Sequence, residues 1–177
     1  MVAFDKDYFS PCVLGGFYLA FVARSENSAV VTDQEKEQMK EQVTALIDKL
    51  VKGCEAANAD SVMSVMMISP EFTYVVNRQS SDYQEFKKGV QSWFEMITSQ
   101  KVTLDNERFS FPFFNSVLYV ADLSLVMNYK NGRTVITDKG VWTLMFKKTG
   151  NDWKLIHGSE FYIYKDAPAE GAVTPVQ

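Results

Sequence analysis

The feature that most constrains the fold is a run of three long alternating segments joined only by short turns. These segments cover residues 117–130, 133–148 and 153–165. Asn131-Gly132 separates the first two and is the strongest short hairpin signal, because a type I′ turn needs positive φ at both central positions. Thr149-Gly150-Asn151-Asp152 marks the second turn. We therefore predict that this part of the chain forms an antiparallel meander.

Helical patterns precede the meander. Thr32 and Glu35 have the spacing of a capping box, and an apolar stripe at the helical period follows them. A second, short helix is predicted to begin at Asn58 or Asp60 and to end before Ser69-Pro70, because the residue before a proline avoids the helical region. The stripe of the first helix comprises Met39, Val43, Leu46, Ile47, Leu50 and Cys54.

A short strand and a third helix complete the pattern. The β-rich run 72–77 predicts the strand, and Ser80, Ser81 or Asp82 can cap the helix that follows. A further strand is predicted at 101–111. Helices followed by a meander predict the α+β class, with N-terminal helices packed on a strongly curved antiparallel sheet that forms a cone with a pocket. The stripe of the third helix comprises Tyr83, Phe86, Val90, Trp93, Phe94 and Ile97.

The 177 residues fit a single domain. We place the cone-shaped domain at 32–165 and a disordered tail at 166–177. Residues 1–31 contain an apolar run at 12–23, which is shorter than the about 20 apolar residues that a membrane-spanning helix needs. The run has the length of the apolar part of a secretory signal. We favour a degenerate export signal, and hence an extracytoplasmic location, over an N-terminal helix packed on the domain of a cytoplasmic protein.

Charge and composition argue against several classes of function. The net charge is −4, and no stretch concentrates Lys and Arg on one face, which disfavours nucleic-acid binding. Cys12, Cys54 and the single histidine, His157, do not have the spacing of a zinc site. No glycine-rich phosphate loop is present. We therefore expect no metal, no cofactor and no nucleic-acid partner.

The two turns predict which side chains share a face of the sheet, since side chains alternate along a strand. Lys130 is predicted to pair with Arg133, and Lys148 with Trp153. The resulting inner face is largely apolar and is expected to pack against the helices. It comprises Tyr119, Ala121, Leu123, Leu125, Met127, Ile136, Trp142, Leu144, Phe146, Leu155, Phe161 and Ile163, together with the polar residues Asp138, His157 and Ser159.

The opposite face of the predicted sheet mixes apolar and polar side chains. Val120, Val126, Val141 and Met145 alternate there with polar residues. Mixed faces of this kind suit an isologous interface, in which two copies present the same surface to one another. We therefore expect a homodimer that forms through this face, and the alternative is a tolerated apolar surface on a monomer.

Together with the order of elements, three segments carry a family resemblance that extends over roughly 32–165: Ala57-Asn58-Ala59-Asp60, Ser69-Pro70-Glu71-Phe72-Thr73-Tyr74 and Trp153-Lys154-Leu155-Ile156-His157. The chain resembles the nuclear transport factor two-like superfamily and, within it, SnoaL-like and related bacterial domains. This resemblance implies a cone-shaped α+β fold with a pocket between sheet and helices. Related members often carry a second histidine two residues after the first. Here that position is Ser159, which argues against a two-histidine or metal-dependent site.

Candidate site residues follow from the predicted inner face. His157 is a candidate acid or base because an imidazole titrates near neutrality, and Asp138 is a candidate base whose pKa apolar walls would raise. The alternatives are a hydrogen-bonded core histidine and an exposed carboxylate at the mouth of the cone. The candidate ligand-binding residues are Tyr74, Trp93, Tyr119, Trp142 and Ser159, of which the aromatic ones equally suit a core.

Two classes of function follow from these observations. The first is a small-molecule-binding domain, not necessarily an enzyme, whose unknown ligand is small and apolar. The alternative is a cofactor-independent isomerase or lyase that acts on a small apolar substrate by acid–base chemistry. A lone buried acid beside a tyrosine would favour the enzyme, whereas a pocket without an acid–base pair would favour binding.

Overall fold

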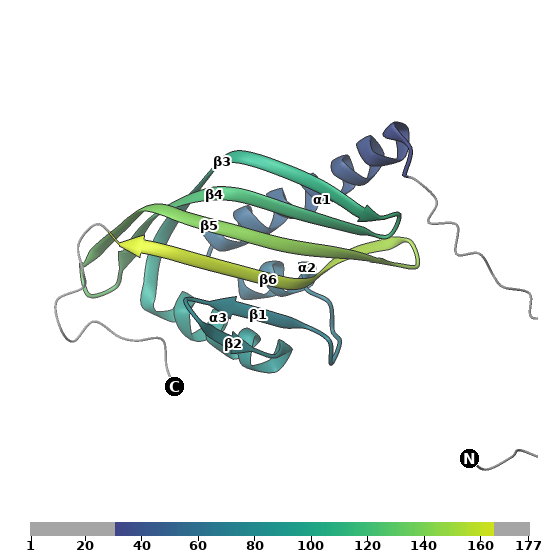
Figure 1. Cartoon of the computed structure of the whole chain (residues 1–177). Coiled ribbons are helices and arrows are strands. Elements are labelled where there is room, and N and C mark those ends of the chain that lie inside the picture. The colour runs from purple at the N-terminus through teal and green to yellow at the C-terminus, as the bar shows by residue number, and fades with distance from the viewer. Residues whose placement is uncertain (1–30, 165–177) are drawn as a thin grey trace, which may run out of the picture.

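The computed structural model describes residues 31–164, which form three helices and one six-stranded sheet (Figure 1). The apolar run at 12–23 and the tail at 166–177 lie outside the described residues. The elements are α1 (Asp33–Glu55), α2 (Ala59–Val65), β1 (Thr73–Val76), β2 (Gln79–Ser81), α3 (Tyr83–Met96), β3 (Ile97–Phe113), β4 (Ser116–Tyr129), β5 (Thr134–Thr149) and β6 (Asp152–Tyr164).

Each helix begins at a polar cap that the sequence predicts. Thr32 caps α1 and forms the complete capping box with Glu35, Asn58 caps α2, and Asp82 caps α3 with a second capping box. In each case a side-chain oxygen accepts a hydrogen bond from a backbone N–H that the helix itself leaves unpaired. The cap residues therefore fix where the helices start.

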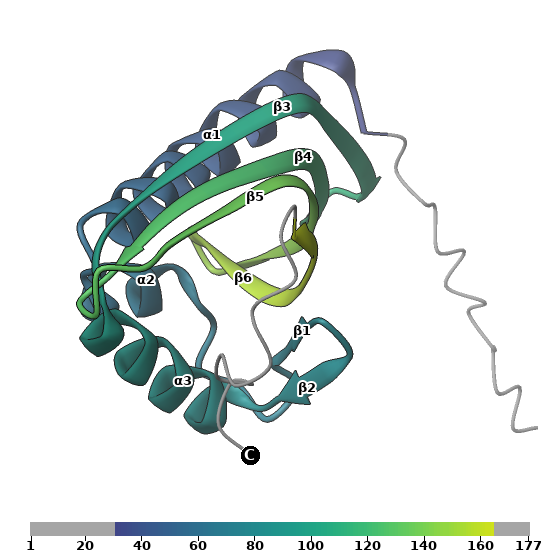
Figure 2. The ribbon, with the colours of Figure 1, turned by 90° about the vertical axis from the view of Figure 1, so that its left-hand side faces the viewer.

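The sheet has the strand order β2-β1-β6-β5-β4-β3. The four long strands β3 to β6 are antiparallel neighbours, as predicted, whereas β1 pairs with β6 in parallel. The sheet is thus mixed. The β1–β2 hairpin, which lies between α2 and α3 in the sequence, adds to the edge of the sheet at β6. The α+β class and the helices packed on a curved sheet are confirmed (Figure 2).

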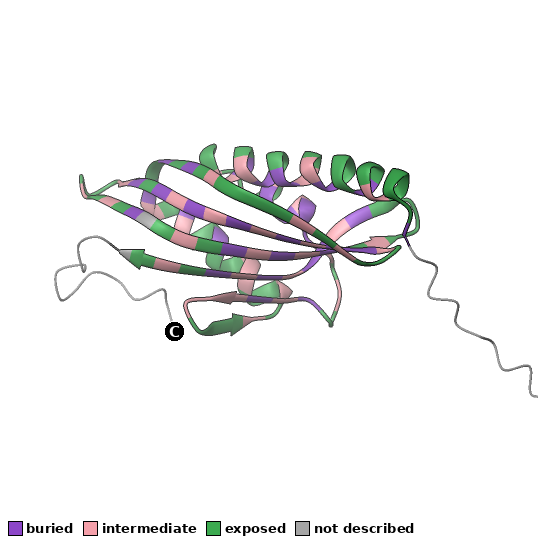
Figure 3. Ribbon diagram, turned by 45° about the horizontal axis from the view of Figure 1, so that its top comes forward, coloured by how far each residue is buried: buried purple, intermediate pink, exposed green. Residues whose placement is uncertain are grey.

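The helices lie on one side of the sheet, and we call the face toward them the inner face (Figures 1 and 2). Tyr119, Leu144, Phe146 and Leu155 lie on this face and are fully buried. Burial alternates along β4 and β5, as Figure 3 shows, because successive side chains point to opposite faces. The core therefore lies between the inner face and the helices.

The β4–β5 hairpin differs from the predicted two-residue turn. The Tyr129 N–H donates to the Arg133 carbonyl at 2.8 Å, and the Gly132 N–H donates to the Tyr129 carbonyl at 2.9 Å. Gly132 has a φ of 83°, but Asn131 is not among the positive-φ residues, so the loop has three residues rather than a type I′ pair. The prediction that Lys130 pairs with Arg133 is wrong by one residue.

An irregularity in the β4–β5 ladder then compensates for the longer loop. Leu125 pairs with Thr137, whereas Leu123 pairs with Gly140 as predicted. The positions near the hairpin are therefore shifted: Thr137 is fully buried, and Ile136, which was predicted on the inner face, is 48% exposed. Asp138 lies in β5 at this irregularity, so its predicted pairing with Leu125 is wrong.

A bulge in β6 corrects the predicted inner face at its other edge. Lys148 pairs with Trp153 and Phe146 with Leu155 in the predicted register, but Met145 pairs with His157, so Ile156 is an extra residue. A bulge of one residue moves every side chain beyond it to the opposite face. The prediction that His157, Ser159, Phe161 and Ile163 lie on the inner face is therefore wrong, and Gly158, Glu160 and Tyr162 lie there instead.

Candidate functional site

The register of β6 places one carboxyl group on the inner face. Glu160 is paired with Trp142 across the β5–β6 ladder and is only 6% exposed. Its Oε2 accepts hydrogen bonds from the Tyr74 hydroxyl at 3.1 Å and from Trp142 Nε1 at 2.7 Å. The Tyr162 side chain also hydrogen-bonds to Glu160. We call these four residues the Glu160 cluster.

The position of Tyr74 depends on a glycine in the neighbouring strand. β1 pairs with β6 so that Tyr74 lies beside Gly158, and a Cβ atom at Gly158 would overlap the Tyr74 ring. The other side of the ring stacks on Phe86 of α3, with centroids 4.2 Å apart. The Tyr74 ring is thus held between β6 and α3 with its hydroxyl directed at Glu160.

Burial dominates the electrostatics of the Glu160 cluster. Loss of solvation raises the pKa of Glu160, while the hydrogen bonds from Tyr162, Trp142 and Tyr74 act in the opposite direction, and the pKa remains above its usual value. Burial and then the charge of Glu160 raise the pKa of Tyr74 and of Tyr162 well above the usual range. The two tyrosines therefore act as hydrogen-bond donors.

Cys54 of α1 lies close enough to Glu160 for the charge of this carboxyl group to affect its thiol. Burial, followed by the charge of Glu160, raises the pKa of its thiol to about 12. A thiol with so high a pKa is protonated at neutral pH and is a poor nucleophile. Cys54 is therefore part of the wall of this interior.

Two further polar atoms on the inner face have no hydrogen-bond partner among the described residues. Thr137 Oγ1 is one, and its residue is fully buried. Gln100 Oε1 is the other, although its amide nitrogen donates to the Cys54 carbonyl. Buried polar atoms without partners are rare in folded proteins, so each one needs an explanation.

The structure brings together only two of the residues that the sequence marks as candidates. Tyr74 and Trp142 meet at Glu160. Tyr119 is buried elsewhere and donates its hydroxyl hydrogen to Glu107 Oε2 at 2.8 Å, and Trp93 of α3 packs against Phe94. The ligand-binding roles of Tyr119 and Trp93 stay predictions.

The two candidate catalytic residues are not part of the Glu160 cluster. His157 pairs with Met145 and Ser159 with Thr143, both on the outer face. The side chain of Asp138 lies outside the described part of the structure. The catalytic roles of His157 and Asp138 stay predictions without a shared geometry to support them.

Sequence reasoning missed Glu160, because the simple alternation of β6 assigned it to the outer face. A carboxylate on an outer face of mixed polarity does not indicate a functional site. The sequence signal that was available is Gly158, since a glycine within a strand often marks a bulge or a close approach of another group. Here it marks the close approach of the Tyr74 ring, two residues after the bulge.

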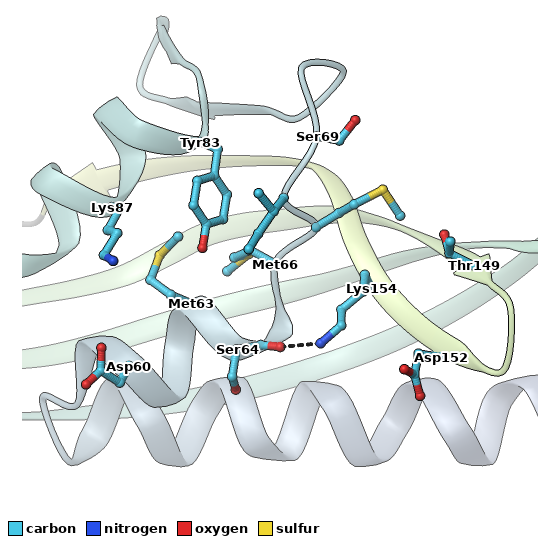
Figure 4. Close-up of a pocket in the computed structure, with 12 residues that line it drawn as sticks. Asp60, Met63, Ser64, Met66, Ser69, Tyr83, Lys87, Thr149, Asp152 and Lys154 are labelled. Carbon is cyan, nitrogen blue, oxygen red and sulfur yellow. Dashed lines mark hydrogen bonds between the residues drawn. The ribbon is translucent and has the colours of Figure 1, made fainter.

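A hollow lies outside the Glu160 cluster, between α2, α3 and the β5–β6 turn (Figure 4). It is an open groove of about 690 Å³, and Lys154 crosses it to donate a hydrogen bond to the Ser64 carbonyl at 2.6 Å. A smaller depression of about 330 Å³ lies at the β3 irregularity around Asn106. The predicted cavity beside Trp93 and Tyr74 stays a prediction.

Neither a metal site nor a membrane-spanning helix is found in the described residues. Between residues 31 and 164, no group of three or more His, Cys, Asp or Glu side chains is arranged to hold a metal ion. Within the same range, no helix is long and apolar enough to cross a membrane.

Helices packed on the inner face of a curved, mainly antiparallel sheet are the architecture of an α+β cone of the nuclear transport factor two-like type. Residues 43–163 match the SnoaL-like domain, and the chain belongs to this family. No protein of curated function matches the sequence.

Solved structures confirm the fold at low sequence identity. The chain is similar to hexachlorocyclohexane dehydrochlorinase LinA-type3 from Novosphingobium barchaimii LL02, with a TM-score of 0.66, 12% identity, and coverage of 81% of this chain and 100% of that chain. It is also similar to a nuclear transport factor 2-like superfamily protein from Salmonella enterica serovar Typhimurium LT2. The TM-score is 0.65 and the identity 15%, and the match covers 78% of this chain and 99% of that chain. A third similar structure is a protein with a cystatin-like fold from Caulobacter vibrioides. The TM-score is 0.61 and the identity 15%, and the match covers 71% of this chain and 90% of that chain.

Proposed function

We propose that this SnoaL-like domain binds a small, largely apolar molecule on its inner face, with the Glu160 cluster as the polar anchor. The observation that carries the proposal is a buried carboxyl group that accepts hydrogen bonds from β1, β5 and β6. Small-molecule sites typically combine apolar walls with a few convergent polar groups, and the Glu160 cluster supplies convergent polar groups beside aromatic rings. The cluster would orient the ligand, and the aromatic rings would supply its contacts.

The unpartnered atoms on the inner face indicate what the ligand offers. Gln100 Oε1 can only accept a hydrogen bond, and Thr137 Oγ1 can accept or donate one. A ligand that carries a hydroxyl or N–H group would satisfy these atoms and remove the cost of burying them alone. We therefore propose an apolar ligand with at least one hydrogen-bond donor.

A lone buried carboxyl group beside two tyrosines, the arrangement expected of an enzyme, favours a second function, a lyase or isomerase that needs no cofactor. A buried carboxyl group with a raised pKa is suited to take a proton from carbon near neutral pH, and perturbed carboxyl groups are concentrated at catalytic sites. One similar structure is that of a dehydrochlorinase, which supports this class. His157 lies on the other face, so Glu160 would act without an imidazole partner.

The binding proposal is tested with Nile red, a neutral apolar dye whose fluorescence rises in apolar sites. We expect saturable binding to the full chain at one dye per chain. Trp142→Phe should weaken the binding, because it removes a donor from the anchor and reshapes the wall. Phe161→Ser, on the outer face, is the matched control and should bind as the natural chain does. Dye binding that does not saturate, or that only Phe161→Ser abolishes, contradicts the proposal.

Native mass spectrometry of the purified chain then separates binding from catalysis. We expect a copurifying small molecule that is lost from Glu160→Ala. If that molecule, added back, is recovered unchanged after incubation with the natural chain, the domain binds it without chemistry. If it is converted by the natural chain and not by Glu160→Gln, the enzyme is the correct alternative.

We also propose that two copies pair through the outer face of the sheet. Exposed apolar side chains on β4, β5 and β6 support this arrangement, since contiguous exposed apolar surface marks interaction sites. The side chains are Val126, Ile136, Val141, Phe161 and Ile163, which are 39–67% exposed. Three of them, Ile136, Phe161 and Ile163, reach this face only because of the irregular registers.

A further inference from the structure

A pair of exposed phenylalanines lies far from the Glu160 cluster, at the tip of the β3–β4 hairpin. Phe113 ends β3 and is 65% exposed, and Phe114 follows in the turn and is 67% exposed. Burying an aromatic ring is one of the largest favourable contributions a side chain can make, yet both rings face solvent. We propose that this hairpin tip inserts into the surface of a lipid bilayer.

The hairpin tip is held in place by the strand beside it. Phe113 pairs with Ser116, so the turn contains only Phe114 and Asn115. The Asn115 carbonyl accepts a hydrogen bond from the Lys148 N–H of β5 at 2.8 Å. The two rings are therefore presented by an ordered turn, and their insertion requires little additional ordering of the backbone.

The charges beside the hairpin tip permit contact with lipid headgroups but do not dominate it. Lys147 is next to the tip, and it forms an ion pair with Glu71 at 3.6 Å. The Lys148 ammonium lies 5.9 Å from the centre of the Trp153 ring. Because one of these two cations is already paired with a carboxylate, insertion depends first on the phenylalanines, and anionic lipid adds a smaller factor.

A second apolar part of the chain favours a bilayer over a protein as the partner. The start of α1 and the end of β3 lie at the same end of the molecule in two views (Figures 1 and 2). The apolar run at 12–23 precedes α1 by fewer than ten residues, which at about 3.3–3.6 Å per residue is a reach of about 30 Å. One bilayer can accept the tip and the run together, whereas a compact protein site at the tip would use only the tip.

The test is flotation of the full chain with phosphatidylcholine vesicles, with and without about one quarter phosphatidylglycerol. We expect the chain to float with both, somewhat more with the anionic vesicles. Phe113→Ser with Phe114→Ser should lower the partition coefficient about tenfold or more, because the two rings are the proposed inserting groups. Phe161→Tyr, which keeps a half-exposed ring on the proposed pairing face, is the control for substitution of a phenylalanine away from the tip and should float as the natural chain does.

Three results would overturn the proposal. The first is a natural chain that floats with neither vesicle, and the second is a double variant that floats as well as the natural chain. The third is a double variant whose particle mass in light scattering falls while its vesicle binding is unchanged, which assigns the tip to a protein contact. Both rings are exposed, so the double variant should keep its thermal midpoint and its Nile red binding. Phe114→Ser alone serves as the second variant.

Discussion

At the scale of single residues, Glu160 shows how burial and hydrogen bonding oppose one another on one carboxyl group. Burial raises its pKa, and three donors lower it without cancelling the effect of burial. A folded pKa above the unfolded value means that the fold prefers the protonated form. The resulting contribution to stability is fully present below the usual pKa of 4.5, and it is lost as the pH rises through the folded pKa.

The pH dependence of Glu160→Gln follows from this sign. The free energy of unfolding of the natural chain should fall relative to that of the variant as the pH rises above 4.5. The slope should reach at most about 1.4 kcal/mol per pH unit. Urea unfolding over a series of pH values measures it, with Glu95→Gln on the exposed side of α3 as a control for the loss of one carboxyl group. A difference that does not change with pH would show that the folded pKa of Glu160 is not raised.

Trp142→Phe tests the hydrogen bond of 2.7 Å between the indole and Glu160. The variant keeps an aromatic ring in the wall but removes the donor, so the carboxyl group loses one partner in a buried place. We expect a loss of about 1–3 kcal/mol in the free energy of unfolding. Denaturant titration followed by far-ultraviolet circular dichroism measures it. An unchanged midpoint would mean that the indole and the carboxyl group do not depend on one another.

At the scale of elements, the close approach of β1 to β6 depends on Gly158. An alanine Cβ at that position would overlap the Tyr74 ring, which is itself stacked on Phe86 and cannot move freely. Gly158→Ala should therefore destabilise the fold by about 1–3 kcal/mol, as overpacking does. Thermal unfolding measures the loss.

Gly89 in α3 provides the matched control for that substitution. No atom lies within 4 Å of a Cβ placed there, and the residue is in the interior of a helix. Gly89→Ala should stabilise the protein by about 0.5–1 kcal/mol. Equal effects of the two substitutions would contradict the proposed contact between β6 and Tyr74.

The elements that sequence could predict are those whose signals are local. Thr32 and Asp82 accept hydrogen bonds from backbone N–H groups in the first turn of their own helices, so these caps can be predicted from the sequence. The registers of the long strands are not local. The extra residue at Ile156 is an ordinary apolar residue in an alternating strand, and only the partners of β6 show that it is a bulge. The α+β class was therefore predictable, and the carboxyl group at the site was not.

At the scale of the whole molecule, the outer face determines how copies of the chain associate. Val141 and Phe161 are register partners on this face and are 39% and 50% exposed. If the chain pairs through it, light scattering at micromolar concentration should give the mass of a dimer. Phe161→Lys should give the monomer mass, because a charge would then be buried opposite its own copy. A monomer mass for the natural chain would rule out the pairing.

The bulge at Ile156 has a consequence for how such a scaffold changes over generations. Deleting this one residue would restore plain alternation in β6. His157 and Ser159 would then turn toward the helices, and Glu160 and Tyr162 would turn toward solvent. A point substitution replaces one side chain. The deletion of a single codon instead moves every side chain beyond it in β6 to the opposite face of the sheet. Two descendants of one ancestral gene that differ by such a deletion would keep the same backbone and carry an imidazole in one interior and a carboxyl group in the other.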